Sequence, residues 1–340
     1  SIFKYIISTS NGSNEGYQTI DRFGVVFASG AGGVCSIGQS VTVPSGQGFS
    51  NSYKLDVTTA DTSISASHYI AVYQYLEAQD VRNSGWNYTS SSSYMTLSFW
   101  VRSSKAGTYC CHFRQEDVSD RYYVFEYTLA ADTWTKVTHS LPGDSSAVFN
   151  NDSGAGLRIG WMLQAGSSRD NATANQWGTS SGNAATSNQV NFFDSTSNDF
   201  YLTGVQFEVG ERATPFEHRS YGDELAKCER YFEVIGGRSE AFMGYAYASA
   251  SAAVAIRYRT VKRAIPGTIT LASAGQSTGE ITFLTAGGTY PSSTGNNTVE
   301  VITAQGFRVT GSSYSGLNAN SPSNFYVTGS AGQTTTIAEV

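Results

Sequence analysis

Alternation of apolar and polar residues dominates this chain and predicts β-strands. Successive side chains of a strand point to opposite faces, so an apolar residue at every second position marks a half-buried strand. Clusters of Gly, Ser, Asn and Asp separate the runs and predict turns. Many short strands without intervening helices favour a β-sandwich or jelly roll. The clearest runs cover residues 95–102, 122–129, 157–164 and 201–209.

The pattern changes to helical spacing at Ser220. Its hydroxyl can cap the free N–H groups of a helix, and Asp223 and Glu224 stand in the first turn, where the helix dipole favours acidic residues. Apolar residues then recur at helical spacing up to Phe232, which predicts a short helix. We therefore place a domain boundary here, between residues 1–219 and 220–340.

Alternation returns after this helix, in residues 254–260, 299–301, 307–309 and 325–327. The sequence thus predicts an all-β protein: an N-terminal jelly-roll β-sandwich, a short connecting helix and a C-terminal β-sandwich domain. Residues 242–255 are rich in Tyr, Phe and Ala, with small residues on both faces. This segment fits either a close-packed subunit interface, for instance of a trimer, or a simple buried strand.

The stretch from Gln164 to Asn188 is polar almost throughout, with Trp177 in its middle. Structureless loops of this length are uncommon in compact domains and are often functional. The alternatives are a binding loop and a mobile insertion without a role of its own.

Composition and charge narrow the function classes. Aromatic residues make up 13% of the chain, which argues against disorder, and 35 glycines suit strands joined by tight turns. The net charge is −6 without a basic run, so we expect no nucleic-acid binding. No apolar stretch approaches ~18 residues, so we expect no membrane insertion. The chain starts at Ser1 without a signal-peptide pattern, as expected for a trimmed or processed N-terminus.

No catalytic motif stands in the sequence context that its chemistry requires. The four cysteines form no CxxC pair and no zinc-type spacing with histidine, and H-E-x-x-H does not occur. The G-x-S-x-G pattern matches residues 178–182 and 275–279, but both matches lie in Gly/Ser-rich stretches and not between a predicted strand and a predicted helix, so we expect no nucleophile elbow. A glycosidase needs two carboxylates at a defined separation, which a sequence does not give. We therefore expect a protein that is not an enzyme and that needs no cofactor.

Three carboxylates, Glu116, Asp117 and Asp120, lie in one predicted turn. Hard cations take oxygen ligands from such turns, although the spacing here is not that of an EF-hand. A solvated turn and a structural calcium loop are the two interpretations.

Aromatic rings beside polar residues are the candidate glycan contacts, because a ring packs on the apolar face of a sugar while amides bind its hydroxyls. Core packing is the alternative for each ring. Trp161 shares the apolar face of its strand and is expected in the core. Two places in predicted loops fit a glycan site: Trp86 with Tyr88, and Trp177 with Asn175 and Gln176.

One junction resembles a known family. Residues 206–210 (Gln-Phe-Glu-Val-Gly), residues 213–217 (Ala-Thr-Pro-Phe-Glu) and a predicted helix ending in Cys-Glu-Arg-Tyr follow one another. This resembles a junction in phage tail-fibre and other virion appendage proteins, where a Gln-Leu-Glu-Val-Gly strand leads to Ala-Thr-Pro-Phe-Glu and a short helix. Residues 49–103 resemble the carbohydrate-binding-module jelly roll that precedes this junction. Residues 262–267 resemble the start of the C-terminal β domain, with Lys262 where the family has Met.

The resemblance implies a homotrimer on the virion surface, in a tail or capsid appendage, made in the host cytoplasm. It implies contacts with other virion proteins and with host-surface glycan. A shallow site with a Kd of ~1 mM becomes useful when several copies act together, because multivalency adds a factor of ~10²–10⁴. The alternatives are a structural virion decoration without a ligand and a polysaccharide depolymerase. The depolymerase fits less well, because the chain lacks a solenoid repeat.

Overall fold

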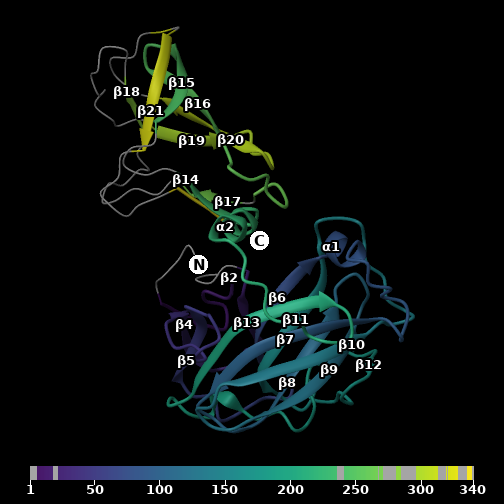
Figure 1. Ribbon diagram of the computed structural model, residues 1–340. Coiled ribbons are helices and arrows are strands. Elements are labelled where there is room, and N and C mark those ends of the chain that lie inside the picture. The colour runs from purple at the N-terminus through teal and green to yellow at the C-terminus, as the bar shows by residue number, and fades with distance from the viewer. Residues whose placement is uncertain are drawn as a thin grey trace. The chain divides into compact units, whose positions relative to one another are not determined.

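The computed structural model describes residues 6–17, 22–235, 241–266, 268–270, 281–284, 296–312, 319, 321–327 and 335–338. The chain divides into two compact units, Ser1–His218 and Arg219–Val340. This division lies beside Ser220, where the sequence predicts the domain boundary. Figure 1 shows both units built mainly from strands.

The first unit is a sandwich of two antiparallel sheets, which confirms the predicted fold class for this half. The six-stranded sheet has the order β1-β4-β5-β13-β7-β10. Two of the strongest predicted runs, 95–102 and 201–209, are its adjacent strands β7 and β13. Its strands are β1 (Ile7–Ser10), β4 (Val34–Ser40), β5 (Ser52–Thr59), β13 (Asp199–Val209), β7 (Tyr94–Ser103) and β10 (Thr135–Pro142).

The seven-stranded sheet has the order β12-β9-β8-β11-β6-β3-β2. The other two predicted runs, 122–129 and 157–164, are its strands β9 and β11. Two short helices, α1 (Ala78–Arg82) and the 3-10 helix η1 (Phe192–Asp194), lie in connections. Its strands are β12 (Trp177–Gly178), β9 (Arg121–Leu129), β8 (Gly107–Gln115), β11 (Ala155–Ala165), β6 (Tyr69–Glu77), β3 (Gly24–Ala28) and β2 (Gly16–Tyr17).

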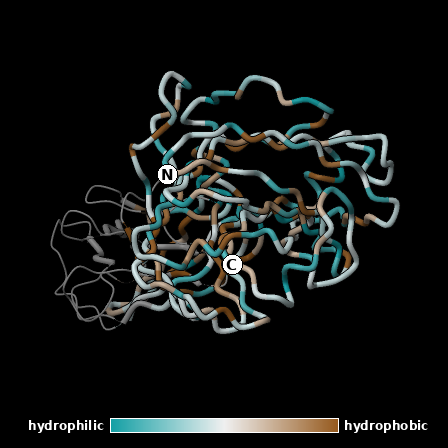
Figure 2. The backbone as a smooth tube through the Cα atoms, turned by 90° about the horizontal axis from the view of Figure 1, so that it is seen from below, coloured by the Kyte–Doolittle hydropathy of each residue, from teal (hydrophilic) through white to brown (hydrophobic). Residues whose placement is uncertain are grey.

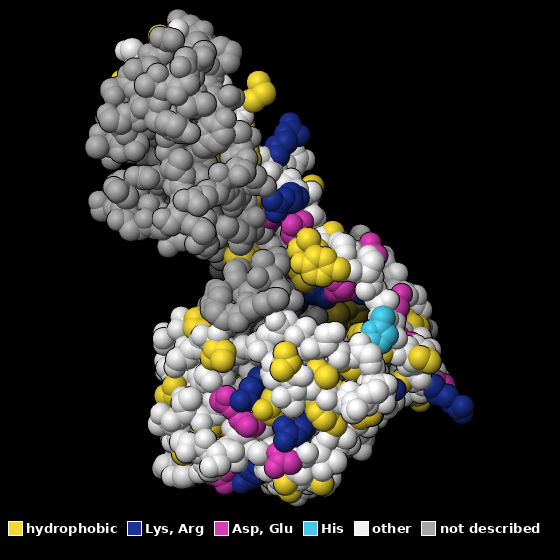
Figure 3. Space-filling model, turned by 60° about the vertical axis from the view of Figure 1, so that its left-hand side comes forward, with side chains coloured by type: hydrophobic (Ala, Val, Ile, Leu, Met, Phe, Trp, Pro, Cys, Tyr) yellow, Lys and Arg dark blue, Asp and Glu magenta, His cyan; other side chains and the backbone are white. Residues whose placement is uncertain are grey.

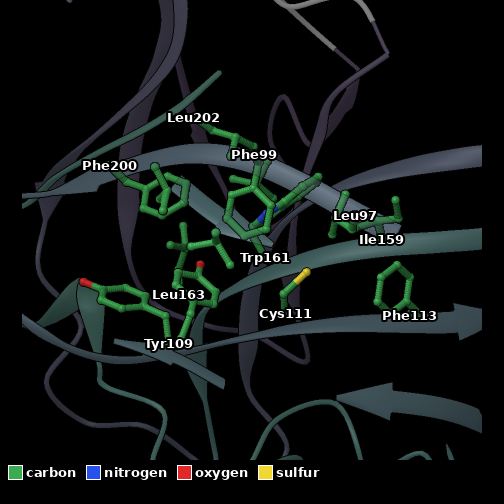
Figure 4. Close-up of a cluster of buried hydrophobic side chains, with 14 of the residues drawn as sticks. Leu97, Phe99, Tyr109, Cys111, Phe113, Ile159, Trp161, Leu163, Phe200 and Leu202 are labelled. Carbon is green, nitrogen blue, oxygen red and sulfur yellow. The ribbon is translucent and has the colours of Figure 1, made fainter. Parts of the chain in front are cut away.

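The core of the first unit lies between these two sheets. Trp161 is fully buried, as predicted, and its ring packs edge-on against Phe99 at 5.7 Å between centroids. Figure 4 shows side chains of β7, β8, β11 and β13 converging on this centre. Figure 2 shows the matching pattern along the chain, where hydrophobic and hydrophilic residues alternate over short distances. The strands are therefore held by burial of their apolar phase, which is the main favourable term in folding.

The second unit begins with helix α2 (Tyr221–Glu229). The Ser220 Oγ accepts a hydrogen bond from the Asp223 backbone N–H at 3.2 Å, so the predicted cap is confirmed. The helix ends three residues earlier than predicted, because Phe232 starts the next strand.

Two antiparallel sheets form the rest of the second unit, with orders β14-β22-β17 and β18-β21-β15-β16-β20-β19. Its described core contains Val254, Ile256, Phe307 and Val309. The strands are β14 (Phe232–Ile235), β22 (Thr335–Ala338), β17 (Thr268–Thr270), β18 (Ile281–Leu284), β21 (Ser321–Val327), β15 (Ala241–Ala248), β16 (Ser251–Arg257), β20 (Gly306–Ser312) and β19 (Asn296–Glu300).

The segment 242–255 is a hairpin of β15 and β16 rather than one buried strand. Ala246 and Ala252 face each other in the core, whereas Met243, Tyr245 and Tyr247 are exposed. The buried-strand interpretation is therefore right for one face only, and the interface interpretation stays a prediction. Within the described part of the chain, no helix has the length and hydropathy that a membrane crossing requires.

Candidate functional site

The polar stretch 164–188 packs on the outer face of the seven-stranded sheet. Ala184 and Ala185 are buried there, in a small second cluster with Cys110, Val124 and Met162 of the sheet. The Ala184 carbonyl also accepts a hydrogen bond from the His112 ring at 3.0 Å. The stretch is thus a packed cover rather than a structureless loop, and its role in binding stays a prediction.

Beside this cover, the same outer face carries a row of aromatic and guanidinium side chains. Strand register places Tyr122 of β9 opposite Arg114 of β8, Arg114 opposite Arg158 of β11, and Arg158 opposite Tyr75 of β6. Cross-strand neighbours on one face have Cβ atoms about 4.5–5.5 Å apart, so these four side chains form one continuous row.

The next row toward the cover contains two rings that lie flat on the sheet. The register sets His112 opposite Gly160, and Gly160 opposite Tyr73. A Cβ atom on Gly160 would lie 2.6 Å from Cε1 of His112, and one on Gly24 would lie 2.7 Å from the Tyr73 hydroxyl. Both rings therefore occupy the space that the side chain of a larger residue would fill, so aromatic rings cover the backbone in this part of the face. We call Tyr69, Tyr73, Tyr75, Tyr122, His112, Arg114, Glu116 and Arg158 the tyrosine–arginine face.

Ionic contacts link the row to one carboxylate. Arg114 donates to Oε2 of Glu116 at 2.7 Å and lies over the Tyr122 ring, 5.7 Å from its centroid. Arg158 lies 3.6 Å from the other oxygen of Glu116, beyond hydrogen-bond range, and its side chain is 7% exposed. Two guanidinium groups thus share a single acidic partner.

Two further titratable groups of the face, Tyr73 and His112, are neutral at pH 7. Burial raises the pKa of Tyr73 to about 12, so its phenol keeps its proton. Burial, helped by the nearby Arg158, lowers the pKa of His112 to about 3. Because Nδ1 of His112 donates to a carbonyl, Nε2 of this neutral ring carries a lone pair.

Several buried polar atoms of this face have no hydrogen-bond partner. Buried polar groups in folded proteins are nearly always bonded, so such atoms need an explanation, and a missing ligand is one. Across the described residues these atoms are spread over both units, but four gather on this face: His112 Nε2, Arg114 Nε, Glu116 Oε1 and Arg158 Nε.

The site residues predicted from the sequence lie elsewhere. Trp86 is 3% exposed, and its indole N–H donates to the Ser93 carbonyl at 3.1 Å. Its neighbour Tyr88 is half-buried and packs edge-on against Phe149 at 5.1 Å. Trp86 is therefore a core residue without a ring face for a ligand, and that prediction is corrected.

Trp177 is half-buried at the edge of the seven-stranded sheet. It pairs with Tyr123 of β9, and its indole N–H donates to the Pro142 carbonyl at 3.0 Å. Its neighbours Asn175 and Gln176 are exposed, and Asn175 adopts a left-handed φ of 65°. A glycan contact here stays a prediction, on a packed ring rather than a free one.

The predicted calcium loop is not assembled. Glu116 pairs with Arg114, and both carboxylate oxygens of Asp117 accept hydrogen bonds from Asn150. In the part of the chain that the structure describes, no three His, Cys, Asp or Glu side chains group as metal ligands. The solvated-turn interpretation is wrong for Glu116, whose side chain is 14% exposed and paired with Arg114. The calcium interpretation is not supported by the contacts of Glu116 and Asp117, and nothing further distinguishes the two interpretations for Asp120.

A pocket opens between the two sheets. It encloses about 240 Å³ and includes Phe23, Gln39 of β4, Tyr53 of β5 and Gln74 of β6 in its lining. Gln74 and Tyr75 are successive residues of one strand, so the pocket and the tyrosine–arginine face lie on opposite sides of the sheet.

The space-filling view in Figure 3 shows acidic and basic side chains interspersed over the described face of the first unit.

Sequence reasoning missed the tyrosine–arginine face, although a signal was present. Tyr73, Tyr75 and Arg158 occupy the polar phase of strands whose apolar phase is the core. Aromatic residues at strand positions that alternation assigns to the solvent side were the signal that could have identified this face.

Comparisons with known proteins give likenesses to solved structures. Neither the protein-family models nor the curated proteins compared with the sequence match it. The enzymatically active domain of tailspike protein 4 from bacteriophage CBA120 is 13% identical over 59% of this chain and 21% of its own, at a TM-score of 0.32. A carbohydrate-binding module of family 4 is 12% identical over 55% of this chain and 78% of its own, at a TM-score of 0.28.

A cyclase from Fischerella sp. TAU is 9% identical over 62% of this chain and all of its own, at a TM-score of 0.32. The part of this chain that matches the tailspike protein spans only about a fifth of the tailspike chain's length. The neighbours therefore include carbohydrate-binding modules and a tailspike domain, but also an enzyme of another kind. At such scores these likenesses carry no argument about the site or its ligand, which must come from the side chains themselves.

Proposed function

We propose that the first unit binds glycan, without catalysis, through the tyrosine–arginine face. The observation that carries the proposal is the row Tyr122–Arg114–Arg158–Tyr75 beside two rings that lie flat over glycines. Aromatic faces pack on the C–H surface of a sugar, and the partly exposed guanidinium of Arg114 offers N–H donors for its hydroxyls.

The carboxylates of the face argue for binding rather than cleavage. Glycoside hydrolysis needs two carboxyl groups about 5 to 9.5 Å apart, one of which donates a proton. The face as defined holds one carboxylate, Glu116, and Arg114 occupies it. We therefore propose an adhesin and expect that a retained polysaccharide gains no new reducing ends during prolonged incubation.

The biological setting of the proposal is a virion surface, in a tail or capsid appendage that carries several copies of this chain. Its support is the junction of residues 206–232, which resembles that of phage fibre proteins. A structural decoration without a ligand is the competing function, and it predicts that no glycan binds.

A glycan array probed with the whole chain tests the binding proposal. We expect retention of at least one glycan class, abolished by Tyr75→Ala because that variant removes one end of the aromatic row. Gln74→Ala is the matched control, since it changes the adjacent residue on the pocket side of the same strand. Retention that survives Tyr75→Ala would reject the tyrosine–arginine face as the site. Loss of retention with Gln74→Ala alone would move the site to the pocket. No retention at all would favour the structural decoration.

A further inference from the structure

The tyrosine–arginine face has more positive than negative charge, in a protein whose net charge is −6. Arg114 and Arg158 share Glu116, which is hydrogen-bonded to Arg114 only. At the border of the face, Arg169 lies over the Tyr69 ring, 5.5 Å from its centroid, and donates to the carbonyls of Ser67 and Ser181. These contacts leave part of the positive charge without an acidic counterpart.

Burial makes this imbalance unfavourable. The Arg158 side chain is 7% exposed, and its Nε atom has no hydrogen-bond partner. A buried cation is tolerated when it is paired and its N–H groups are bonded, and Arg158 meets neither condition fully. Tyr73 and His112, two neighbours of Arg158 on this face, are neutral at pH 7 and supply no countercharge.

We infer that Arg158, together with Arg114, binds the anionic group of an acidic saccharide. The inference rests on the proposed glycan-binding function and specifies its substrate class. A guanidinium offers parallel N–H donors that match the oxygens of a carboxylate or a phosphate. The sugar ring that bears this group would then lie on Tyr75 or Tyr122, the neighbours of the two arginines in the row.

Titration of the whole chain with D-glucuronate, D-glucose and inorganic phosphate at equal ionic strength tests this inference. We expect glucuronate to bind with a Kd of ~1 mM, at least about tenfold tighter than glucose, and to weaken with added salt. Phosphate binding at a similar strength would identify a phosphate substituent as a second acceptable anion. Binding of phosphate but not of glucuronate would assign the site to phosphorylated glycans.

Substitutions of Arg158 separate this inference from the proposed function. Arg158→Gln should weaken glucuronate binding about tenfold or more and leave glucose binding unchanged. Arg158→Lys keeps the positive charge but not the planar guanidinium with its parallel N–H donors, so it should retain part of the affinity for glucuronate. The matched control is Arg102→Gln, since Arg102 also lies over a tyrosine ring, that of Tyr201, but on the six-stranded sheet.

The possible outcomes distinguish the inference of an anionic saccharide from the proposal of glycan binding. Equal affinity for glucuronate and glucose in the unmodified chain overturns the anionic inference even if Arg158→Gln does not fold. If Tyr75→Ala still abolishes glycan retention in that case, the glycan-binding proposal stands alone. If no array glycan and none of the three probes binds, both statements fail.

Discussion

At the residue scale, glycine decides where rings can lie on the outer face of the seven-stranded sheet. Gly160 and Gly24 have no Cβ, and the rings of His112 and Tyr73 cover their backbone. A strand interior normally disfavours glycine, because it contributes no side-chain packing and has a large conformational entropy when unfolded. The two glycines are thus explained by close approach of the rings rather than by turn geometry.

Gly160→Ala should destabilise the first unit by about 1–3 kcal/mol, because the new methyl group must displace the His112 ring from its place on the sheet. The bond from His112 to the Ala184 carbonyl would weaken with it. All five tryptophans lie in the first unit, so urea unfolding followed by tryptophan fluorescence reports this change. Gly222→Ala is the control, since nothing lies within 4 Å of its new Cβ. Equal midpoints for Gly160→Ala and the unmodified chain would contradict this account.

The buried His112 predicts a pH dependence of stability. Its folded pKa of about 3 lies below the unfolded value of ~6.5, so the unfolded chain binds a proton that the folded protein does not. Stability from this group is complete above pH ~6.5 and is lost as the pH falls toward 3, by about 2 kcal/mol at pH 5. Burial lowers the pKa of His139 to about 4, which adds in the same direction.

Urea unfolding at pH 7 and pH 5 measures this loss. His112→Gln should make the decrease smaller, whereas His218→Gln, at an exposed position, should leave it unchanged. An identical decrease in all three chains would show that other groups cause it.

At the element scale, strand positions could be predicted and strand neighbours could not. The four strongest runs are β7, β9, β11 and β13 in the structure, because the alternation of apolar and polar residues that marks a half-buried strand is visible within each run. Register and sheet order depend on contacts between distant residues, so the row joining Tyr122 to Tyr75 was invisible in any single run. The cover formed by 164–188 was missed for the same reason, since two alanines fix it to the sheet.

A buried lysine is explained by its contacts at this scale. The side chain of Lys262 is fully buried. It donates to Glu233 of β14 at 2.8 Å and to the carbonyl of Glu229 at the end of α2. The lysine therefore links the helix, the strand and its own loop in the second unit.

Lys262→Met alone should destabilise the second unit by about 3–5 kcal/mol, because it leaves Glu233 buried without its main cationic partner. Adding Glu233→Leu should recover part of the loss, since an apolar pair of similar volume avoids the unpaired charge. Hydrogen exchange in β14 follows the second unit without tryptophan. Exposed Lys227→Met serves as the control, and equal exchange in it and in Lys262→Met would refute the linking role.

At the scale of the whole molecule, the strength of binding depends on how many copies of the chain are held together. A single face with one row of side chains supports only weak binding, with a Kd of ~1 mM, while copies held together gain a factor of ~10²–10⁴ on a dense surface. The resemblance of the junction at residues 206–232 implies a homotrimer, and on that proposal light scattering should give three times the 36.4 kDa of one chain. Binding to a densely coated glycan surface should then exceed binding to a sparse one by the stated factor, and Tyr75→Ala should remove both. A monomer that binds dense and sparse surfaces equally would contradict the appendage setting, yet leave the tyrosine–arginine face as a glycan site, because the row of side chains is complete within one chain.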